Sequence, residues 1–373
     1  MYQDTPINEI NELLEKSWTA FHQYSKYPLS MRAKLLRTIA EELELAGDQL
    51  IQVAMKETQL PEARLRNERG RTIFQLNSYG EAAEKGHWLE ARIDTADPNR
   101  NPPKPDIRKM LVPLGPVVVF GASNFPFAFS TAGGDTASAL AAGCSVIVKA
   151  HPAHPETSAM AAEAIKKAVS RCGLPESIFI HVFGASVEVG KVLVTHTRTK
   201  AVGFTGSYQG GKALFDWANQ RKEPIPVFAE MGSVNPVFLF PDKIHSSAAE
   251  TAAMYAGSIT LGVGQFCTNP GLLIGIDSED LNLFISSLGE AIRKTQPAPM
   301  LHGGIAKTYR EKKAAALAQA GNELVAESEG APGEGQGSAA IASVSGDTFL
   351  ENPLLHQEVF GPYSLVVRCR DMA

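Results

Sequence analysis

The sequence predicts an α/β protein whose first domain is built on a doubly wound parallel sheet. Short continuous apolar runs, such as the VVVF at residues 117–120, are typical of strands buried on both faces of a sheet. Similar runs follow at 146–149, 178–182, 201–204 and 226–229, and helix-compatible segments separate them at 136–142, 158–169, 187–194 and 211–219. This βα alternation predicts a parallel sheet and excludes an all-α or all-β fold.

The first 94 residues are expected to form helices that accompany this sheet. Apolar residues recur at helical spacing in 7–21 and in 31–45, where Ser30 is a candidate N-cap, and the helical pattern continues through 49–57. The segment 62–89 alternates Arg with Glu, which predicts a solvated face. Residues 95–114 form a connector, because its proline-rich part cannot be helical, and a strand is predicted at 107–112.

The sheet domain is assigned to residues 115–232 and a second α/β domain to residues 233–373. In the second domain, strands are predicted at 236–240, 272–276 and 364–368, and helices at 246–259 and 280–294. The Gly-, Ala- and Ser-rich segment 323–345 is predicted to be a mobile surface excursion. Because few domains end directly after a strand, the chain is expected to be incomplete.

Composition narrows the class of protein. The chain has 373 residues, 44% hydrophobic and 20% charged, as in ordinary soluble globular proteins. A net charge of −5 argues against a nucleic-acid partner, and no apolar run approaches the roughly 20 residues that span a bilayer. The four cysteines show neither paired nor CxxC spacing, so no disulfide framework is indicated. A cytoplasmic enzyme without a membrane partner fits these features.

Cys267 is the candidate nucleophile. It lies in GQFCTNP, where Gly262 and Gly264 lower helix propensity and Asn269 precedes a proline, so a turn is expected. A thiol on a turn is accessible, as a nucleophile must be. The alternative is that Cys267 is a small buried hydrophobic residue.

Two stretches suggest an anionic ligand. In GSYQGG, residues 206–211, glycines follow a strand and open a helix, an arrangement that lets backbone N–H groups approach a phosphate. The spacing is not the Rossmann G-x-G-x-x-G, so a simple tight turn is an equal alternative. Lys149 ends an apolar strand, where ligands of α/β sheets collect, although a lysine that merely reaches solvent is equally compatible.

Three further polar residues follow strands or precede a turn. Glu230 ends a strand between apolar runs, where burial would raise its pKa into the range of a general base, and loop amides are the alternative partner. Asn124 follows the first strand, where its side-chain amide could donate a hydrogen bond to a developing oxyanion. The alternative is that Asn124 only forms a turn. Glu358 has no independent signal and is expected to be an exposed charge. His151 and His154 have the HxxH spacing of some metal sites, but the neighbouring prolines prevent the helix that would hold both side chains on one face. We therefore assign no metal to them.

Together these segments resemble the aldehyde dehydrogenase superfamily over nearly the whole chain. Five motifs occur in the family's order: SNFPFAFSTAGGDTASALAAGCSVIVKAHPAHPETS, AVGFTGSYQGG, FAEMGSVNPVF, GQFCTNPG and EVFGP. The form KAHPAHP, with GGDTASALAAG, looks most like the α-ketoglutaric semialdehyde (2,5-dioxopentanoate) dehydrogenase branch. A related NADP-dependent branch that acts on longer-chain aldehydes shares much of this pattern.

The resemblance implies a catalytic set. Cys267 matches the nucleophile that forms a thiohemiacetal and then a thioester, and Glu230 matches the base for thioester hydrolysis. Asn124 matches the oxyanion amide, partnered by the backbone N–H of Cys267. The usual Glu-Leu-Gly-Gly-Lys is Glu-Met-Gly-Ser-Val here, which leaves the assignment of Glu230 unchanged.

The resemblance also implies a nicotinamide cofactor. Lys149 matches the lysine at the adenine ribose, Ser207 lies at the pyrophosphate, and the turn is shaped by Gly206 and Gly211. Glu358 matches the acid on the nicotinamide ribose, with Phe360 beside the nicotinamide. Many NAD-preferring members carry an acidic residue three positions after the lysine. Pro152 stands there, so NADP is predicted to be preferred, with NAD possible.

The family's domain plan implies that both ends of the chain are missing and that residues 95–114 are part of an oligomerisation segment. Full-length relatives are expected to be homo-oligomers that act on a small aldehyde. The alternatives to a semialdehyde dehydrogenase are an NADP-dependent enzyme for long-chain or other aldehydes, and a fragment that binds nucleotide but is catalytically incomplete.

Overall fold

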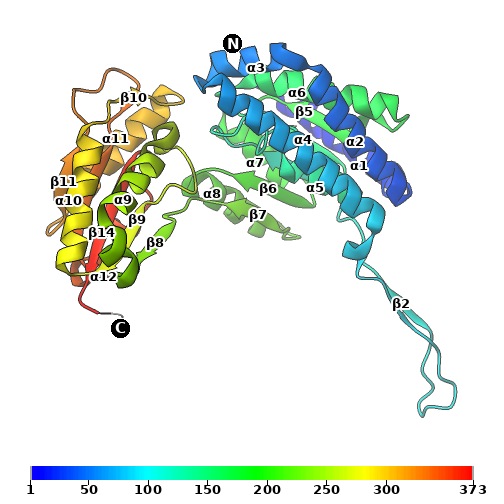
Figure 1. Cartoon of the computed structure of the whole chain (residues 1–373). Helices are drawn as coiled ribbons and strands as arrows, with labels where there is room; N and C mark the ends of the chain where they lie inside the picture. The colour runs from blue at the N-terminus through cyan, green and yellow to red at the C-terminus, as the bar shows by residue number, and fades with distance from the viewer. Residues whose placement is uncertain (1, 372–373) are drawn as a thin grey trace. The chain divides into compact units, whose positions relative to one another are not determined.

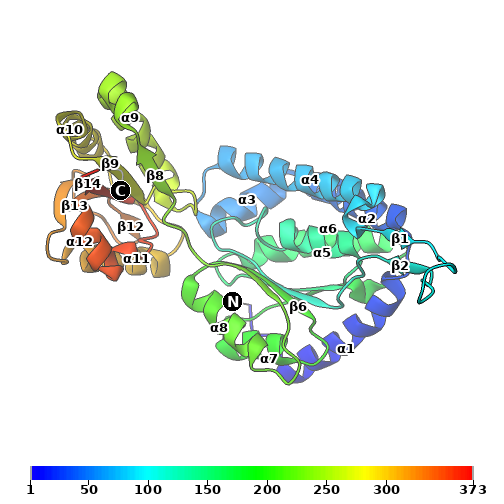
Figure 2. The ribbon, with the colours of Figure 1, turned by 90° about the horizontal axis from the view of Figure 1, so that it is seen from below.

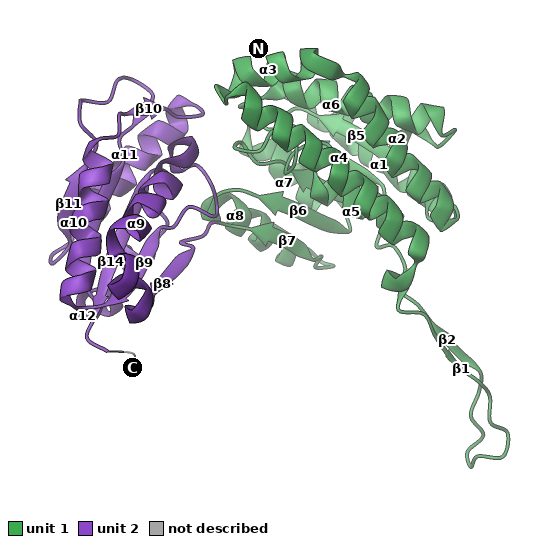
Figure 3. Cartoon of the chain, in the orientation of Figure 1, with its two compact units in different colours: residues 1–231 green, residues 232–373 purple. Residues whose placement is uncertain are grey.

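The computed structural model describes residues 2–371, which divide into two compact units (Figure 1). Unit 1 extends to Met231 and unit 2 begins at Gly232 (Figure 3). Each unit is an α/β layer structure with its own sheet and core.

The sheet of unit 1 is parallel throughout, as predicted. Its strands have the order β5-β4-β3-β6-β7, so the chain starts in the middle and winds outward in both directions. Val118 of the central strand is fully buried, as expected for a sheet with helices on both faces. The strands are β3 (Val117–Phe120), β4 (Val146–Lys149), β5 (Phe179–Val182), β6 (Ala201–Thr205) and β7 (Val227–Glu230).

Helices cover both faces of this sheet (Figure 2). One face packs against α1 (Ile7–Tyr24), α7 (Val187–Thr195) and α8 (Tyr208–Asn219). The other carries α2 (Leu29–Leu45), α3 (Gly47–Thr58), α4 (Glu62–Lys85), α5 (Gly134–Ala142) and α6 (Pro155–Arg171), with the short 3-10 turns η1 (His87–Leu89) and η2 (Glu176–Ile178) elsewhere in the unit. The predicted cap at Ser30 is wrong. Helix α2 begins at Leu29 after Pro28, whose extended backbone starts the helix without a side-chain cap, so Ser30 lies inside the first turn.

The connector contains an antiparallel ribbon that projects from the rest of unit 1 (Figure 1). Strand β1 (Arg92–Asp94), which the sequence did not reveal, pairs with β2 (Ile107–Lys109), and a further bridge joins Asp97 to Lys104. The strand predicted at 107–112 therefore ends at Lys109, which pairs with Arg92, the first residue of its partner strand.

The sheet of unit 2 is mixed. Its order is β11-β13-β14-β9-β8, and every neighbouring pair is parallel except β11 with β13. Its strands are β8 (Pro236–Leu239), β9 (Leu272–Ile276), β11 (Glu323–Glu327), β13 (Ala340–Ser345) and β14 (Tyr363–Cys369), and a separate pair is formed by β10 (Ala298–Pro299) and β12 (Gln336–Gly337).

Two apolar clusters flank this sheet. Helices α9 (Pro241–Thr260) and α10 (Glu279–Arg293) pack on one face, and α11 (Gly303–Leu317) packs on the other. The remaining elements are α12 (Gly346–Glu351), η3 (Leu261–Gly264) and η4 (Pro353–His356). Across residues 2–371, no helix combines the length and the hydropathy needed to cross a bilayer.

The segment 323–345 is not a mobile excursion, which corrects the sequence-based expectation. It supplies β11 and β13, and β13 lies between two other strands with Ile341 fully buried. The Ala and Ser residues of β13 are weak strand formers by propensity, but they fit the crowded layer between α10 and α11.

We predict that Ile341→Ala will destabilise the protein by about 2–5 kcal/mol, because it leaves a cavity in the core of unit 2. Leu324→Ala on the edge strand β11 is the matched control. Its side chain is 50% exposed, so its loss is expected to change the unfolding free energy by less than about 1 kcal/mol. Urea unfolding measures both, and equal effects would show that β13 is not part of the core.

Candidate active site

The sheet of unit 1 gathers the predicted residues of that unit at one edge. Phe120 of β3 pairs with Lys149 of β4 on one side and with Phe204 of β6 on the other, and Thr205 pairs with Glu230 of β7. Because these strands are parallel, their carboxyl ends lie at the same edge. The loops that carry Asn124, Gly206 and Ser207 also begin at this edge.

Lys149 is held at this edge by backbone carbonyls. Its Nζ donates to the carbonyl of Gly184 at 2.8 Å and to that of Ala150 at 3.2 Å. Burial lowers the pKa of Lys149 to about 8, and the nearby carboxylate of Asp4 partly opposes this shift. The ammonium group therefore lies in a low-dielectric setting, where an anionic group would be attracted strongly.

The turn after β6 combines tight packing with a helix N-terminus. Ser207 is the N-cap of α8, and its Oγ accepts a hydrogen bond from the N–H of Gly210 at 3.2 Å. A Cβ on Gly206 would lie 2.7 Å from the ring of Phe204, and one on Gly211 would lie 2.3 Å from Met231. Packing alone explains both glycines, and the N-terminus of α8 still favours an anion beside Ser207.

Glu230 is exposed in this structure, so the burial expected from its apolar neighbours in the sequence is not found. It has an acidic neighbour that the sequence did not single out. Burial, and secondly the charge of Glu230, raise the pKa of Asp135 in the first turn of α5. The Asp135 carboxyl packs on Gly203, where a Cβ would lie 3.2 Å from it.

Asn124 lies half-buried in an irregular loop after β3, as the sequence predicted. Its backbone carbonyl accepts a hydrogen bond of 2.7 Å from Nη2 of Arg64. Helix α4, which was predicted to present a solvated face, thus directs Arg64 and the buried Glu68 towards this loop. These contacts could not be predicted from the sequence pattern, because they join residues about 60 positions apart.

In unit 2, Cys267 lies half-buried in a turn in which the N–H of Asn269 donates to the carbonyl of Phe266, as predicted. Gly262, Val263 and Gly264 precede it with φ of 54°, 56° and 62°. A Cβ on Gly264 would lie 2.4 Å from the backbone of Gly361, so only glycine fits this close approach.

Side chains on both sides of the cysteine fix the turn. The buried Gln265 accepts a hydrogen bond from the N–H of Leu301 at 2.9 Å. Asn269 Nδ2 donates to the carbonyls of Gly361 at 3.3 Å and Tyr363 at 3.2 Å. Cys267 is therefore presented by a turn that is anchored to two other segments of unit 2, at Leu301 and at residues 361–363.

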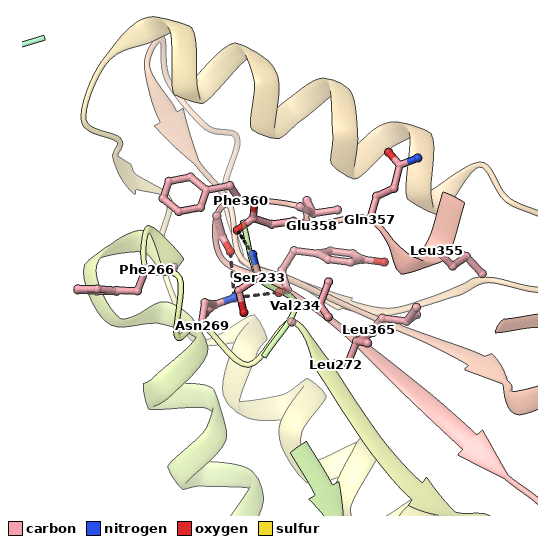
Figure 4. Close-up of a pocket in the computed structure, with 15 residues that line it drawn as sticks. Ser233, Val234, Phe266, Asn269, Leu272, Leu355, Gln357, Glu358, Phe360 and Leu365 are labelled. Atoms are coloured by element: carbon pink, nitrogen blue, oxygen red, sulfur yellow. Dashed lines mark hydrogen bonds between the residues drawn. The ribbon is translucent and has the colours of Figure 1, made fainter. Parts of the chain in front are cut away.

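Glu358 and Phe360 line a pocket next to this turn (Figure 4). The expectation that Glu358 is an exposed charge is wrong. Its side chain is half-buried, burial raises its pKa, and its Oε1 accepts from the N–H of Ser233 at 3.3 Å. The pocket is also lined by Gly264, Phe266 and Asn269 of the cysteine turn.

Comparison with known proteins identifies the family. The model of the aldehyde dehydrogenase family matches residues 2–373. The chain belongs to the aldehyde dehydrogenase family. Proteins of this family are oxidoreductases that act on aldehydes with NAD⁺ or NADP⁺.

Named relatives of this aldehyde dehydrogenase chain cover almost all of it. It is 48% identical to α-ketoglutaric semialdehyde dehydrogenase 2 of Azospirillum brasilense, over 98% of this chain and 70% of that protein. It is 41% identical to the α-ketoglutaric semialdehyde dehydrogenase of Acinetobacter baylyi, over 100% of this chain and 71% of that protein.

Solved aldehyde dehydrogenases share the fold. The structure superposes with a TM-score of 0.81 on an NAD-dependent benzaldehyde dehydrogenase from Corynebacterium glutamicum, at 22% identity, over 99% of this chain and 78% of that one. Within unit 1 of this aldehyde dehydrogenase chain, the N-terminus of α8 and the desolvated Lys149 are features that suit an anionic group. Residues 2–371 contain no cluster of three or more His, Cys, Asp or Glu placed to bind a metal.

We predict that Gly232→Ala will displace the Glu358 side chain and destabilise the protein by about 1–3 kcal/mol. Gly232 has a φ of 106°, and its Cβ would lie 2.7 Å from Oε2 of Glu358. Gly257→Ala is the control, because that glycine lies in α9 with open space around it and is expected to gain up to about 1 kcal/mol. Urea unfolding of both variants tests this, and a neutral Gly232→Ala would contradict the close contact.

Proposed function

We propose that this protein oxidises α-ketoglutaric semialdehyde to 2-oxoglutarate with NADP⁺ as the preferred cofactor. The observation that carries the choice of substrate is the identity of 48% and 41% to two proteins named for that aldehyde. We assign cofactor binding mainly to unit 1 and the nucleophile to unit 2.

In the first step, the thiolate of Cys267 adds to the aldehyde carbon and forms a thiohemiacetal. The side-chain amide of Asn124 and the backbone N–H of Cys267 donate hydrogen bonds to the oxyanion. A nicotinamide held beside Glu358 and Phe360 would supply the oxidant, because it would accept the hydride lost from this carbon when the thiohemiacetal becomes a thioester.

In the second step, Glu230 takes a proton from a water molecule that attacks the thioester. The C–S bond breaks, the carboxylic acid leaves, the thiolate of Cys267 is released for the next cycle, and the proton passes from Glu230 to solvent. Glu230 is exposed in this structure, so water reaches it without displacing protein atoms.

For the cofactor, we assign Lys149 to the adenine ribose, and Ser207, with the turn shaped by Gly206 and Gly211, to the pyrophosphate. Glu358 and Phe360 are assigned to the nicotinamide end, because both line the pocket beside the cysteine turn. Pro152 follows Lys149 by three residues, so no carboxylate at that position repels a 2′-phosphate.

We also propose that the ribbon of β1 and β2 is the oligomerisation segment of a homo-oligomer. It projects from the rest of unit 1 (Figure 1). Its apolar side chains Ile93 and Ile107 are exposed. Exposed apolar residues on a projecting strand pair are typical of surfaces that contact another subunit.

Cys267→Ala is expected to abolish reduction of NADP⁺ by the semialdehyde, because no thiohemiacetal forms. Glu230→Gln is expected to release one equivalent of reduced cofactor in a burst and then to stall at the thioester. Stopped-flow absorbance at the NADPH band measures both results.

Cys369→Ala is the control for the loss of a partly exposed thiol elsewhere in unit 2, and its turnover should match the unchanged protein. Turnover by Cys267→Ala at the unchanged rate would refute the mechanism. Calorimetric binding of NADP⁺ without acylation of Cys267 would instead favour the alternative of a nucleotide-binding chain that does not catalyse.

The choice of aldehyde is tested by comparing kcat/KM for α-ketoglutaric semialdehyde, succinic semialdehyde and a long-chain aldehyde. We expect the first to have the highest value. A higher value for the long-chain aldehyde would overturn the proposed substrate but not the cysteine mechanism.

We predict a higher kcat/KM with NADP⁺ than with NAD⁺, and an advantage that shrinks between pH 7 and pH 9. Lys149 has a pKa of about 8, so it is charged below this value and loses its attraction for a 2′-phosphate above it. Asp4→Asn should move this loss of the NADP⁺ advantage to lower pH, because the charge of Asp4 opposes the lowering of the Lys149 pKa. A strong preference for NAD⁺ at pH 7 would contradict the proposal.

A further inference from the structure

The loop that carries Asn124 lies between β3 and α5 and has no helix or strand of its own. Residues 121–133 form turns and bends. A hydrogen-bond donor to an oxyanion must be held within a few tenths of an ångström of its working position, because a misplacement of about 1 Å can cost about a hundredfold in rate. Some other part of the fold must therefore hold this loop.

Glu68 of helix α4 binds the part of the loop that follows Asn124. Its side chain is buried, and its Oε1 accepts hydrogen bonds from the N–H groups of Phe127 at 2.8 Å and Ala128 at 3.0 Å. One carboxylate oxygen thus satisfies two backbone donors that have no ladder or helix partner. Burial raises the pKa of Glu68 to about 7, although both amides oppose this shift.

Arg64, one helical turn earlier, binds Asn124 itself. Its Nη2 donates to the backbone carbonyl of Asn124 at 2.7 Å and lies 4.0 Å from Oε2 of Glu68. The guanidinium carbon also lies 4.8 Å from the ring centre of Phe125. Because Arg64 and Glu68 are four residues apart, they share one face of α4, and this face is the one that meets the loop.

The start of the loop is fixed independently. Nε2 of the buried His154 donates to the carbonyl of Ala122 at 2.9 Å, and the N–H of Ala122 donates to the carbonyl of Phe129 at 2.8 Å. These contacts hold the backbone before and after Asn124. Among them, the hydrogen bond from Arg64 is the one made to the backbone of Asn124 itself.

We propose that Arg64 and Glu68 are positioning residues for Asn124: they fix the loop backbone so that the side-chain amide points at the reacting carbonyl oxygen. The proposal rests on the proposed role of Asn124 as oxyanion donor. Both residues bind the backbone of the loop, so their effect on rate is assigned to the placement of Asn124.

A double-mutant cycle tests this dependence. Asn124→Ala is expected to lower kcat by about 10²–10³-fold. Arg64→Ala is expected to lower kcat by about ten- to a hundredfold, with the KM for NADP⁺ unchanged. The double variant should be no slower than Asn124→Ala within about threefold, because the positioned group is already absent. Additive losses would show a general structural role and overturn the proposal.

Arg66→Ala is the matched control on the same helix. The guanidinium of Arg66 forms exposed ion pairs with Asp48 and Glu62, so the kcat of Arg66→Ala should equal that of the unchanged protein. Glu68→Gln keeps an oxygen that accepts from the loop amides and should retain most of the rate, whereas Glu68→Ala should behave like Arg64→Ala. A Glu68→Ala variant at full rate would contradict the assignment.

Hydrogen exchange measured by mass spectrometry tests the loop without turnover. The amides of Phe127 and Ala128 should exchange at least about tenfold faster in Glu68→Ala, and the loop peptide faster in Arg64→Ala, with no change in Arg66→Ala. Unchanged exchange would overturn the proposal even if all variants were inactive. If Asn124→Ala alone left kcat unchanged, the oxyanion role would fail, while exchange would still report whether α4 holds the loop.

Discussion

The parallel register of the sheet in unit 1 is the constraint on which the candidate cofactor site depends. Phe120 is paired with Lys149 and with Phe204, so three neighbouring strands end in the same row of the sheet. Neighbouring strands lie about 4.8 Å apart, so an extended ligand along this edge reaches several loops at once. A slip of one residue in β4 would move Lys149 to the opposite face and remove its charge from the edge.

Unit 2 holds Cys267 by a different means. Neither a helix nor a strand contains the cysteine, and the turn is fixed by backbone contacts that require Gly264 next to Gly361. Val263, a β-branched residue, is forced to a φ of 56°, which is unfavourable by itself and is retained because Gln265 and Asn269 anchor the turn. Strain of this kind is characteristic of sites where the placement of one side chain matters more than local stability.

Much of the fold could be predicted from the sequence, because buried parallel strands produce continuous apolar runs and βα units alternate regularly. The strand at Leu272–Ile276 was predicted to the residue. The central strand Ala340–Ser345 was missed because its small residues are favoured by packing between helices and not by intrinsic propensity. Glu68 was missed because a buried carboxyl on a charge-rich helix is indistinguishable from a solvated one until its distant partners are known.

Turn and strand-end positions in the site were predictable in the same way, since Cys267 precedes an Asn-Pro pair and Lys149 ends an apolar run. The environments of the site residues were not. Exposure of Glu230 and burial of Glu358 reverse what their neighbours in the sequence suggested, because β7 is an edge strand while residues 357–361 fold over the cysteine turn. Solvent exposure depends on which segments cover a residue, and this is a non-local property.

Two ionisable groups of unit 1, Lys149 and Glu68, lower the folding stability near neutral pH. Lys149 has a folded pKa of about 8, below its usual value, so its charged form is disfavoured by folding at every pH below about 8. Glu68 has a raised folded pKa of about 7, so the stability that it contributes in acid is lost as the pH rises through 7. Near pH 7.5 both effects oppose folding, yet each group has specific partners: carbonyls for Lys149 and loop amides for Glu68. A fold optimised for stability alone would place apolar residues at these positions, so the two charges are best explained by what they hold: Lys149 an anionic ligand and Glu68 the Asn124 loop.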